Sequence, residues 1–146
     1  MARMEVDKAD FLIRDLEKLA KLPDKVIEDM LNAGADVLVP AQRAEIQRQW
    51  SGPHSMGISA KSIKKGKVKK TKNGLGRVIS VYPQGTRKRN GKTIRNGEIA
   101  FINEYGAKER NIAPRHAIFT ANKKAEEAAI DAAERVYHAY LDSKNL

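Results

Sequence analysis

The stretch "PRHAIFTANKKAEEAAIDAAERVYHAY", residues 114–140, predicts a long amphipathic helix in the last third of the chain. Its proline can open the helix, because the first helical position needs no amide hydrogen. Small and apolar residues recur every three or four positions and charged residues occupy the other side. The predicted inner stripe consists of Ile118, Ala121, Ala125, Ala128, Ala132 and Val136. Such an alanine-lined face permits close approach of another helix or a sheet.

The N-terminal third predicts two further helices. The first extends from about Lys8 to Leu22, where leucines recur at i, i+4 and i+7. The second extends from Pro23 to about Trp50, and Pro40 inside it is expected to kink or split it. The apolar face of this second helix is predicted to be Ile27, Met30, Leu31, Gly34, Val37, Leu38 and Ala41.

The middle of the chain predicts β-structure, because it contains three Asn-Gly dipeptides, at residues 73–74, 90–91 and 96–97. Asn-Gly between β-like segments is a strong hairpin signal, since both residues tolerate positive φ. We expect strands at residues 62–71 and 75–82 joined by a turn at 73–74, and then a looser arm, "PQGTRKRNGKTIRNG", residues 83–97. The following "EIAFINEYG", residues 98–106, reads as a strand end or a short helix, with Gly106 suited to a left-handed C-terminal cap.

These elements predict an α+β fold. It comprises N-terminal helices, a small antiparallel β-sheet with long basic hairpins, and a long C-terminal helix packed on the sheet. A chain of 146 residues is long enough for one domain with a limited core, and we expect a single domain over residues 1–146.

Charge is strongly segregated along the chain. The formal net charge is +10, yet residues 51–97 contain no aspartate or glutamate. A surface of this kind needs a polyanion or an acidic protein partner to relieve its self-repulsion. Thirteen basic residues fall in this window and form the predicted contact arm: Lys61, Lys64, Lys65, Lys67, Lys69, Lys70, Lys72, Arg77, Arg87, Lys88, Arg89, Lys92 and Arg95.

Three roles for this arm are open: it binds nucleic acid, it lines a passage for nucleic acid, or it is a solvated loop. Tyr82 is its only aromatic residue, so base stacking has little to use. Contact with nucleic acid would therefore be electrostatic, independent of sequence and dependent on salt. We expect residues 61–97 to be flexible in the free monomer.

Nothing in the sequence predicts catalysis, a metal site or a cofactor. Cysteine is absent, and no Gly-x-Ser-x-Gly motif occurs. The histidines His54, His116 and His138 are scattered, and the i, i+4 pair of His138 with Glu134 reads as a helix surface. We interpret the acidic cluster of Asp24, Glu28 and Asp29 as the solvent-exposed face of an amphipathic helix. We see no signal-peptide core and no apolar run of membrane-spanning length, and expect a protein made inside a cell.

Two segments together resemble a family of tailed-bacteriophage tail-completion, or head–tail joining (neck), proteins. "GPHSMGISAKSI", residues 52–63, is similar to the segment that follows the family's second helix, and "IAFINEYGAKERNIAPRHAIFTA", residues 99–121, is similar to the family's motif before the last helix. Ser55-Met56 and His116-Ala117 depart from the family's Asp-Thr and Pro-Phe. The matching positions are Pro53, Gly57, Ser62, Ile63, Ala100, Glu104, Tyr105, Gly106, Arg115, Ile118 and Ala121.

The resemblance implies a non-enzymatic component of the virion tail or neck, present in the host cytoplasm during assembly. Such proteins assemble as rings, often with six-fold symmetry, around the channel through which DNA leaves. The implied partners are further copies of this chain, other neck or tail proteins and, without sequence preference, genomic DNA. In such a ring the acidic helical surface of one subunit could meet the basic hairpin of the next. The alternative is a small, non-specific nucleic-acid-binding protein that acts through its basic hairpins.

Overall fold

The computed structural model describes residues 22–50, 57–74 and 76–144, so the predicted helix over residues 8–22 lies almost wholly outside the described residues. The helices in chain order are α2 (Asp24–Trp50), α3 (Ile58–Ser62), α4 (Asn96–Tyr105), a 3-10 turn η1 (Lys108–Arg110) and α5 (Ala117–Ser143). The strands are β1 (Ile63–Lys65), β2 (Lys69–Lys70), β3 (Arg77–Val78), β4 (Val81–Pro83), β5 (Thr86–Arg89) and β6 (Lys92–Arg95).

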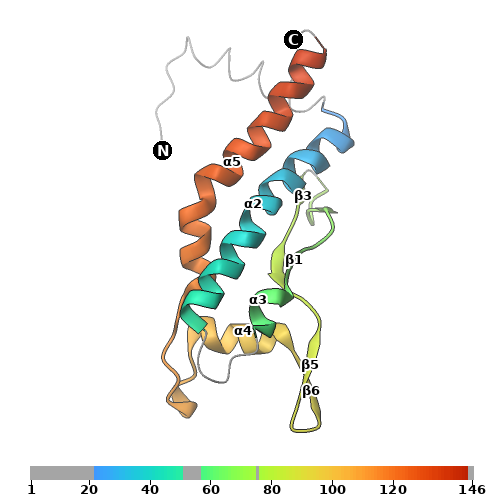
Figure 1. The fold of residues 1–146 in the computed structure, drawn as a ribbon. Coiled ribbons are helices and arrows are strands. Elements are labelled where there is room, and N and C mark those ends of the chain that lie inside the picture. Colours follow the sequence, from blue (N-terminus) through green and yellow to red (C-terminus); the bar gives the residue numbers. More distant parts are fainter. Residues whose placement is uncertain (1–21, 51–56, 75, 145–146) are drawn as a thin grey trace.

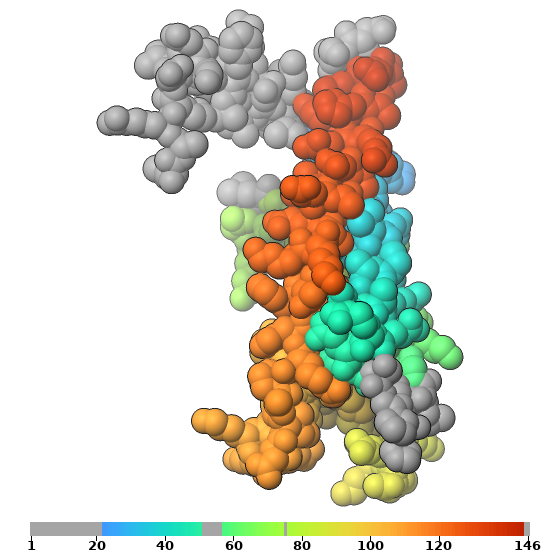
Figure 2. Space-filling model, turned by 60° about the vertical axis from the view of Figure 1, so that its left-hand side comes forward, coloured from blue at the N-terminus to red at the C-terminus, as the bar shows by residue number. Residues whose placement is uncertain are grey.

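Two long antiparallel helices, α2 and α5, form the body of the molecule and lie side by side over most of their length (Figures 1 and 2). The strands lie on the side of α2 away from α5, and α4 crosses the end where α2 finishes and α5 begins (Figure 1). The predicted α+β class is confirmed. None of the helices in the described ranges has an apolar stretch that could cross a bilayer.

The helix α2 is continuous through Pro40, so the expectation that the proline splits it is wrong. Pro40 is exposed, and so is Asp36 four residues earlier. Proline removes the hydrogen bond to the carbonyl of that earlier residue. On this exposed side water can satisfy the carbonyl, which explains why the helix tolerates the proline.

Fewer residues of α5 are buried against α2 than the predicted six-residue stripe. The predicted alanines Ala121 and Ala125 are buried, but Ala128 is exposed, and the backbone of Ala129 instead lies 3.4 Å from where a side chain on Gly34 would be. On α2 the predicted apolar face is only half-buried, and the fully buried residues are Ala35, Gln42, Glu45, Ile46 and Trp50.

The hydrophobic core lies at the end of the molecule where α4 crosses. There Trp50 and Ile46 of α2 meet Ile63 of β1 and the first turn of α5, together with Ala60 of α3 and Ala100 of α4. Val81 of β4 and Ile118 of α5 pack against this cluster. The long C-terminal helix therefore meets the β-structure through its first turn and packs on α2 over the rest of its length.

The first predicted hairpin is present but interrupted. β1 pairs with β4 in the register Lys64 to Tyr82, and β2 pairs with β3 further out. Between the two ladders Gly66 lies against the ring of Tyr82, where an added Cβ would be 3.2 Å from a ring carbon. This close approach accompanies the break in a strand that the sequence predicted to be continuous. The result is two short ladders in place of two long strands.

The three Asn-Gly dipeptides have three different roles. Residues 90–91 form the two-residue turn between β5 and β6, with φ of 52° at Asn90 and 76° at Gly91. At residues 73–74 only the glycine has positive φ, and the loop is closed by hydrogen bonds between Thr71 and Gly76. Residues 96–97 begin α4. The arm at residues 83–97, predicted to be loose, is thus a regular hairpin leading into a helix.

Candidate functional site

The predicted basic arm forms what we call the cationic edge: α3, the six strands and their turns, residues 58–95. The β1–β4 and β2–β3 ladders form one ribbon along α2, on the side away from α5, and the β5–β6 hairpin forms a second ribbon that extends past the end of the molecule where α4 lies (Figure 1). The cationic edge therefore runs along α2 and beyond its C-terminal end. All thirteen predicted basic residues lie on it, but the structure gives them three different environments.

Three of the thirteen are paired with carboxylates of the same chain. Lys65 lies 2.8 Å from Asp36, Arg77 lies 3.2 Å from Asp24, and Arg95 lies 2.7 Å from Glu98. The carboxylate side chains in these pairs are more than half exposed, and exposed ion pairs contribute about 0–1 kcal/mol each. These three predicted contact residues therefore have a partner within the chain, and whether they also meet another molecule stays a prediction.

Arg87 is a structural residue and not a free surface cation. Its guanidinium donates hydrogen bonds to Asn96 Oδ1 at 2.7 Å and to Ser59 Oγ at 2.8 Å. Asn96 in turn donates to the carbonyl of Gln84 at 2.8 Å. Burial lowers the pKa of Arg87, and the charge of Arg89 adds to this. The group fastens the β5–β6 hairpin to α3 and α4.

The other nine basic residues are exposed, and none makes an ion pair with a carboxylate in the described ranges. Their ammonium and guanidinium groups are free to bind phosphate or carboxylate groups of another molecule. Tyr82 is the aromatic residue beside them and is 46% exposed. The nine are Lys61, Lys64, Lys67, Lys69, Lys70, Lys72, Lys88, Arg89 and Lys92.

Free carboxylates gather elsewhere, on the second half of α5. This segment, residues 126–142, carries five acidic residues and one arginine, Arg135. All five are exposed and make no ion pair within the described residues, namely Glu126, Glu127, Asp131, Glu134 and Asp142. The strands and α5 lie on opposite sides of α2, so this helix separates the elements that carry the two sets of charges (Figure 1).

In the first family-like segment, the residues that the structure describes build the core end of the molecule. Gly57 precedes α3 with φ of 70°, and Ser62 Oγ donates to the carbonyl of Ser59 at 2.6 Å. Ile63 is fully buried, and its carbonyl accepts two hydrogen bonds from the guanidinium of Arg43, at 3.1 and 2.7 Å. Pro53 lies outside the described residues. These positions hold the start of the cationic edge against α2.

The second family-like segment joins α4 to both long helices. Glu104 is buried, and its carboxylate accepts hydrogen bonds from the backbone amides of Ile118 and Phe119, both at 2.9 Å. Arg115 donates to the carbonyl of Gln49 at 3.1 Å and to Asn103 Oδ1 at 2.8 Å. The indole of Trp50 donates to the carbonyl of Arg115 at 2.8 Å.

Gly106 ends α4 with positive φ, as expected, but not in the predicted left-handed helical conformation. Its φ is 76° and its ψ is 177°, a region open essentially to glycine alone. An added Cβ would lie 2.6 Å from the carbonyl oxygen of Ile112 and 2.8 Å from the nitrogen of Pro114. The neighbouring Tyr105 is 61% exposed and belongs to no core.

Tyr105 is part of a surface that the sequence reading missed, which we call the aromatic end: Phe101, Tyr105, His116 and Phe119. The three aromatic side chains of Phe101, Tyr105 and Phe119 are each at least 60% exposed. Their rings and that of His116 follow one another at centroid distances of 4.9, 6.1 and 6.5 Å. A signal was available, because "EIAFINEY" has apolar residues on every side of a helix.

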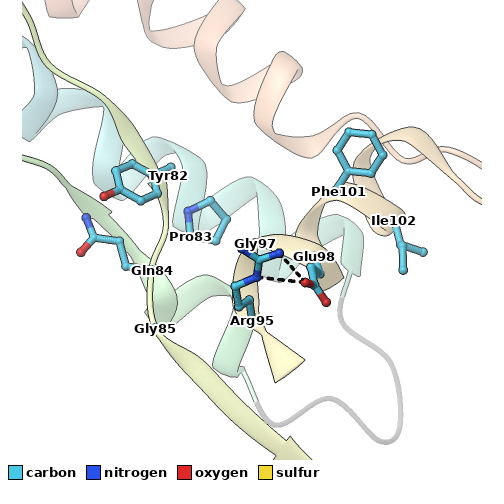
Figure 3. Close-up of a pocket in the computed structure, with 9 residues that line it drawn as sticks. All are labelled: Tyr82, Pro83, Gln84, Gly85, Arg95, Gly97, Glu98, Phe101 and Ile102. Carbon is cyan, nitrogen blue, oxygen red and sulfur yellow. Dashed lines mark hydrogen bonds and ion pairs between the residues drawn. The ribbon is translucent and has the colours of Figure 1, made fainter. Parts of the chain in front are cut away.

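A hollow of about 860 Å³ opens beside this surface. Figure 3 shows Tyr82, Pro83 and Gln84 from the ribbon on one side and Phe101 and Ile102 from α4 on the other, with the Arg95–Glu98 ion pair between them. A second hollow of about 310 Å³ shares Pro83, Gly97 and Phe101 with it and extends to Phe119. Together they form a groove whose walls combine apolar side chains with the Arg95–Glu98 ion pair.

Metal ligation has no support within the described residues, where no group of three His, Asp or Glu side chains could hold an ion. In the acidic cluster at the start of α2, Asp24 pairs with Arg77 and Asp29 with Lys25 at 2.6 Å. The hydrogen bond and charge of Asp29 raise the pKa of Lys25.

Comparison of the chain with protein-family models, with curated proteins and with solved structures finds no match.

Proposed function

We propose that this chain is a structural, non-catalytic subunit of the neck or tail terminus of a tailed bacteriophage. In this role it completes the tail or joins it to the head, and it assembles as a ring around the DNA channel. It would act in the virion and pass through the host cytoplasm during assembly. The resemblance in residues 52–63 and 99–121 suggests the family, and its ring is often six-fold.

The observation that carries the proposal is the separation of the nine unpaired cations on the ribbons from the five unpaired carboxylates on α5. A subunit in a closed ring presents a different surface to each of its two neighbours. A chain with opposite charges on two sides meets this requirement. The core and the hydrogen bonds at the family-like positions would then serve to hold the two charged surfaces in a fixed relation.

The test is native mass spectrometry and negative-stain electron microscopy of the full chain over a range of protein and salt concentrations. We expect closed oligomers of one size that dissociate as salt rises, because opposite charges on two surfaces attract less when screened. A protein that stays monomeric at all concentrations and with purified neck or tail proteins would overturn the proposal.

The second candidate is a small nucleic-acid-binding protein, favoured by the same nine exposed cations. In this case the monomer binds duplex DNA of any sequence, with log K falling by about 0.9 per contacted phosphate for each tenfold rise in salt. Fluorescence anisotropy with two unrelated duplexes measures this. Tight binding by monomers at physiological salt, without closed oligomers, would favour this candidate over the first.

A further inference from the structure

The short helix α4 buries polar residues and exposes aromatic ones, which is the reverse of the usual surface helix. Its buried residues are Asn96, Ala100 and Glu104, whereas Phe101 and Tyr105 are exposed at 63% and 61%. A soluble helix normally directs its carboxylate to water and its aromatic rings to the core. Here the buried carboxylate caps α5, so this orientation is fixed. The outer face of α4 therefore presents two exposed aromatic rings beside the Arg95–Glu98 ion pair, and a partner could cover the rings.

Hollows lie on both sides of this outer face. One is the groove toward Tyr82 and Pro83, described above. The other, about 280 Å³, lies toward the β5–β6 hairpin. Its lining comprises four isoleucines, two arginines, Asn103 and the carboxylate of Glu98, which pairs with Arg95; the isoleucines are Ile94, Ile99, Ile102 and Ile112 and the arginines Arg89 and Arg110. A ridge of side chains between two grooves is the surface onto which another helix packs. The shape therefore favours a helical partner with apolar side chains.

The charges around the aromatic end favour an acidic partner. Arg89 and Arg110 line the second hollow, and Lys123 follows Phe119 by one helical turn on α5. Lys88 and Lys92 are at the tip of the adjoining hairpin. All five are exposed and have no carboxylate partner among the described residues. An apolar helix with carboxylates on its flanks would complement them.

The chain itself contains a helix of this kind. Ile130 of α5 is 52% exposed, and Glu126, Glu127 and Glu134 lie within about one helical turn of it. Tyr137 lies two turns further along the same stripe and is half-buried. Ile130 and Phe119 are on one rigid helix and about 16 Å apart at 1.5 Å per residue, so they cannot meet within a single chain.

We propose that the aromatic end of one copy of this chain binds the second half of α5, residues 126–142, of another copy. Ile130 of the second copy packs against Phe101 and Tyr105, and its glutamates pair with the cations of the β5–β6 hairpin. The two surfaces differ, so each copy can bind one neighbour through each surface, as a ring requires. This inference rests on the proposed self-assembly and names the contact that would produce it.

Cysteine cross-linking tests the contact, because the chain has no cysteine of its own. Phe101→Cys and Ile130→Cys are made as separate single variants, at positions exposed enough to leave the fold intact. Oxidation of a mixture should give a disulfide-linked heterodimer, and each variant alone should stay unlinked. A chain carrying both changes should give a ladder ending at the size of the closed oligomer. The control pairs Phe101→Cys with Gln47→Cys, which is exposed on α2, and should give no product.

Charge reversal provides a second measurement. Glu127→Lys with Glu134→Lys should lower the yield of the Phe101–Ile130 cross-link by about tenfold, since like charges then face each other. Three results would overturn the inference while leaving the proposed function standing, provided that the unaltered chain forms rings. These are no cross-link in the mixture, linking of Phe101→Cys with itself, and equal linking to the Gln47→Cys control. If the unaltered chain never self-associates, the proposed function and this inference fail together.

Discussion

Glu104 caps the N-terminus of α5 from a different helix, with its carboxylate 2.9 Å from the backbone amide of Phe119. The first amides of a helix have no partner within it, and a carboxylate there also meets the positive end of the helix dipole. The same contact brings the ring of Phe119 beside those of α4. Glu104 thus fixes where α5 begins, and it places the ring of Phe119 in the aromatic end.

Replacement of this cap should destabilise the fold. We expect Glu104→Ala to lower the free energy of unfolding by about 1–3 kcal/mol, because two backbone amides lose their acceptor. Urea unfolding followed by circular dichroism measures the change. The control Glu109→Ala, at an exposed position in the turn after α4, should change stability by less than about 0.5 kcal/mol. Equal stability of Glu104→Ala and the unaltered chain would contradict the assigned role.

Gly106 should be less tolerant of substitution than any other glycine with positive φ. Gly106→Ala is expected to cost about 3 kcal/mol or more, since it adds close contacts with Ile112 and Pro114 to an unfavourable backbone conformation. The matched control is Gly91→Ala, which also has φ of 76° but open space around the added Cβ. It should cost about 1–2 kcal/mol from the backbone alone. The comparison of the two thermal midpoints separates the contacts from the conformation, and equal losses would refute the contact explanation.

Glu45 should make the stability of the α2–α5 pair depend on pH in the acid range. Its pKa is lowered from 4.5 to about 2, first by the hydrogen bond from Gln49 and then by those from Lys124 and Arg48. A carboxyl group whose pKa is lower in the folded than in the unfolded state stabilises the folded state at pH values above its unfolded pKa. This contribution is lost as the pH falls toward the pKa of the folded state. The thermal midpoint should therefore decline between pH 4.5 and about 2.

The variant Glu45→Gln should show a flatter decline over that interval and a lower midpoint at neutral pH. Lys124 Nζ lies 2.6 Å from the carboxylate of Glu45, so the variant also loses an ion pair between the two helices. Glu109→Gln, at an exposed carboxylate without an ion pair in the described ranges and outside the proposed contact, serves as the control and should retain the profile of the unaltered chain. Parallel profiles for Glu45→Gln and the unaltered chain would exclude this role of Glu45.

Limited digestion with trypsin should cut the cationic edge first. The earliest cuts are expected after the exposed lysines at residues 69–72 and 88–92, within the wider window of residues 61–95, because these tips have few apolar contacts. Arg43 and Lys65 should be protected for longer, since one bonds the carbonyl of Ile63 and the other pairs with Asp36. Mass mapping over time gives the order of cleavage. First cuts within α2 or α5 would contradict this expectation.

The sequence correctly predicted the helices and the turn that have a strong local signal. The long C-terminal helix, the second helix up to Trp50 and the turn at Asn90-Gly91 all follow from periodicity or turn chemistry. The prediction from sequence was wrong where contacts with other parts of the chain, or exposure to solvent, determine the structure. The repeat on α5 could not distinguish Ala128 from Ala129, and the proline in α2 could not show that its surroundings are exposed and that the helix continues through it.

The candidate site shows the same division. Charge counting found all thirteen cations but could not separate Arg87, which is used in the fold, from the nine that are free. Nor could it pair Lys65 with Asp36 or Arg77 with Asp24, because these partners are far apart in the chain. The aromatic end escaped notice because it depends on the direction of Glu104. Only the fold reveals that this carboxylate points inward and leaves the rings outside.

The contact of α5 with α4 has a mechanical implication. Helix α5 has 27 residues, which at 1.5 Å per residue is about 40 Å. Because α5 packs along α2, the two long helices would have to turn together, and a rotation of this pair by roughly 10° with α4 would carry the distant tip of α5 through about 7 Å. Small adjustments where α4 touches another molecule would thus be magnified into large displacements at the opposite pole of the subunit.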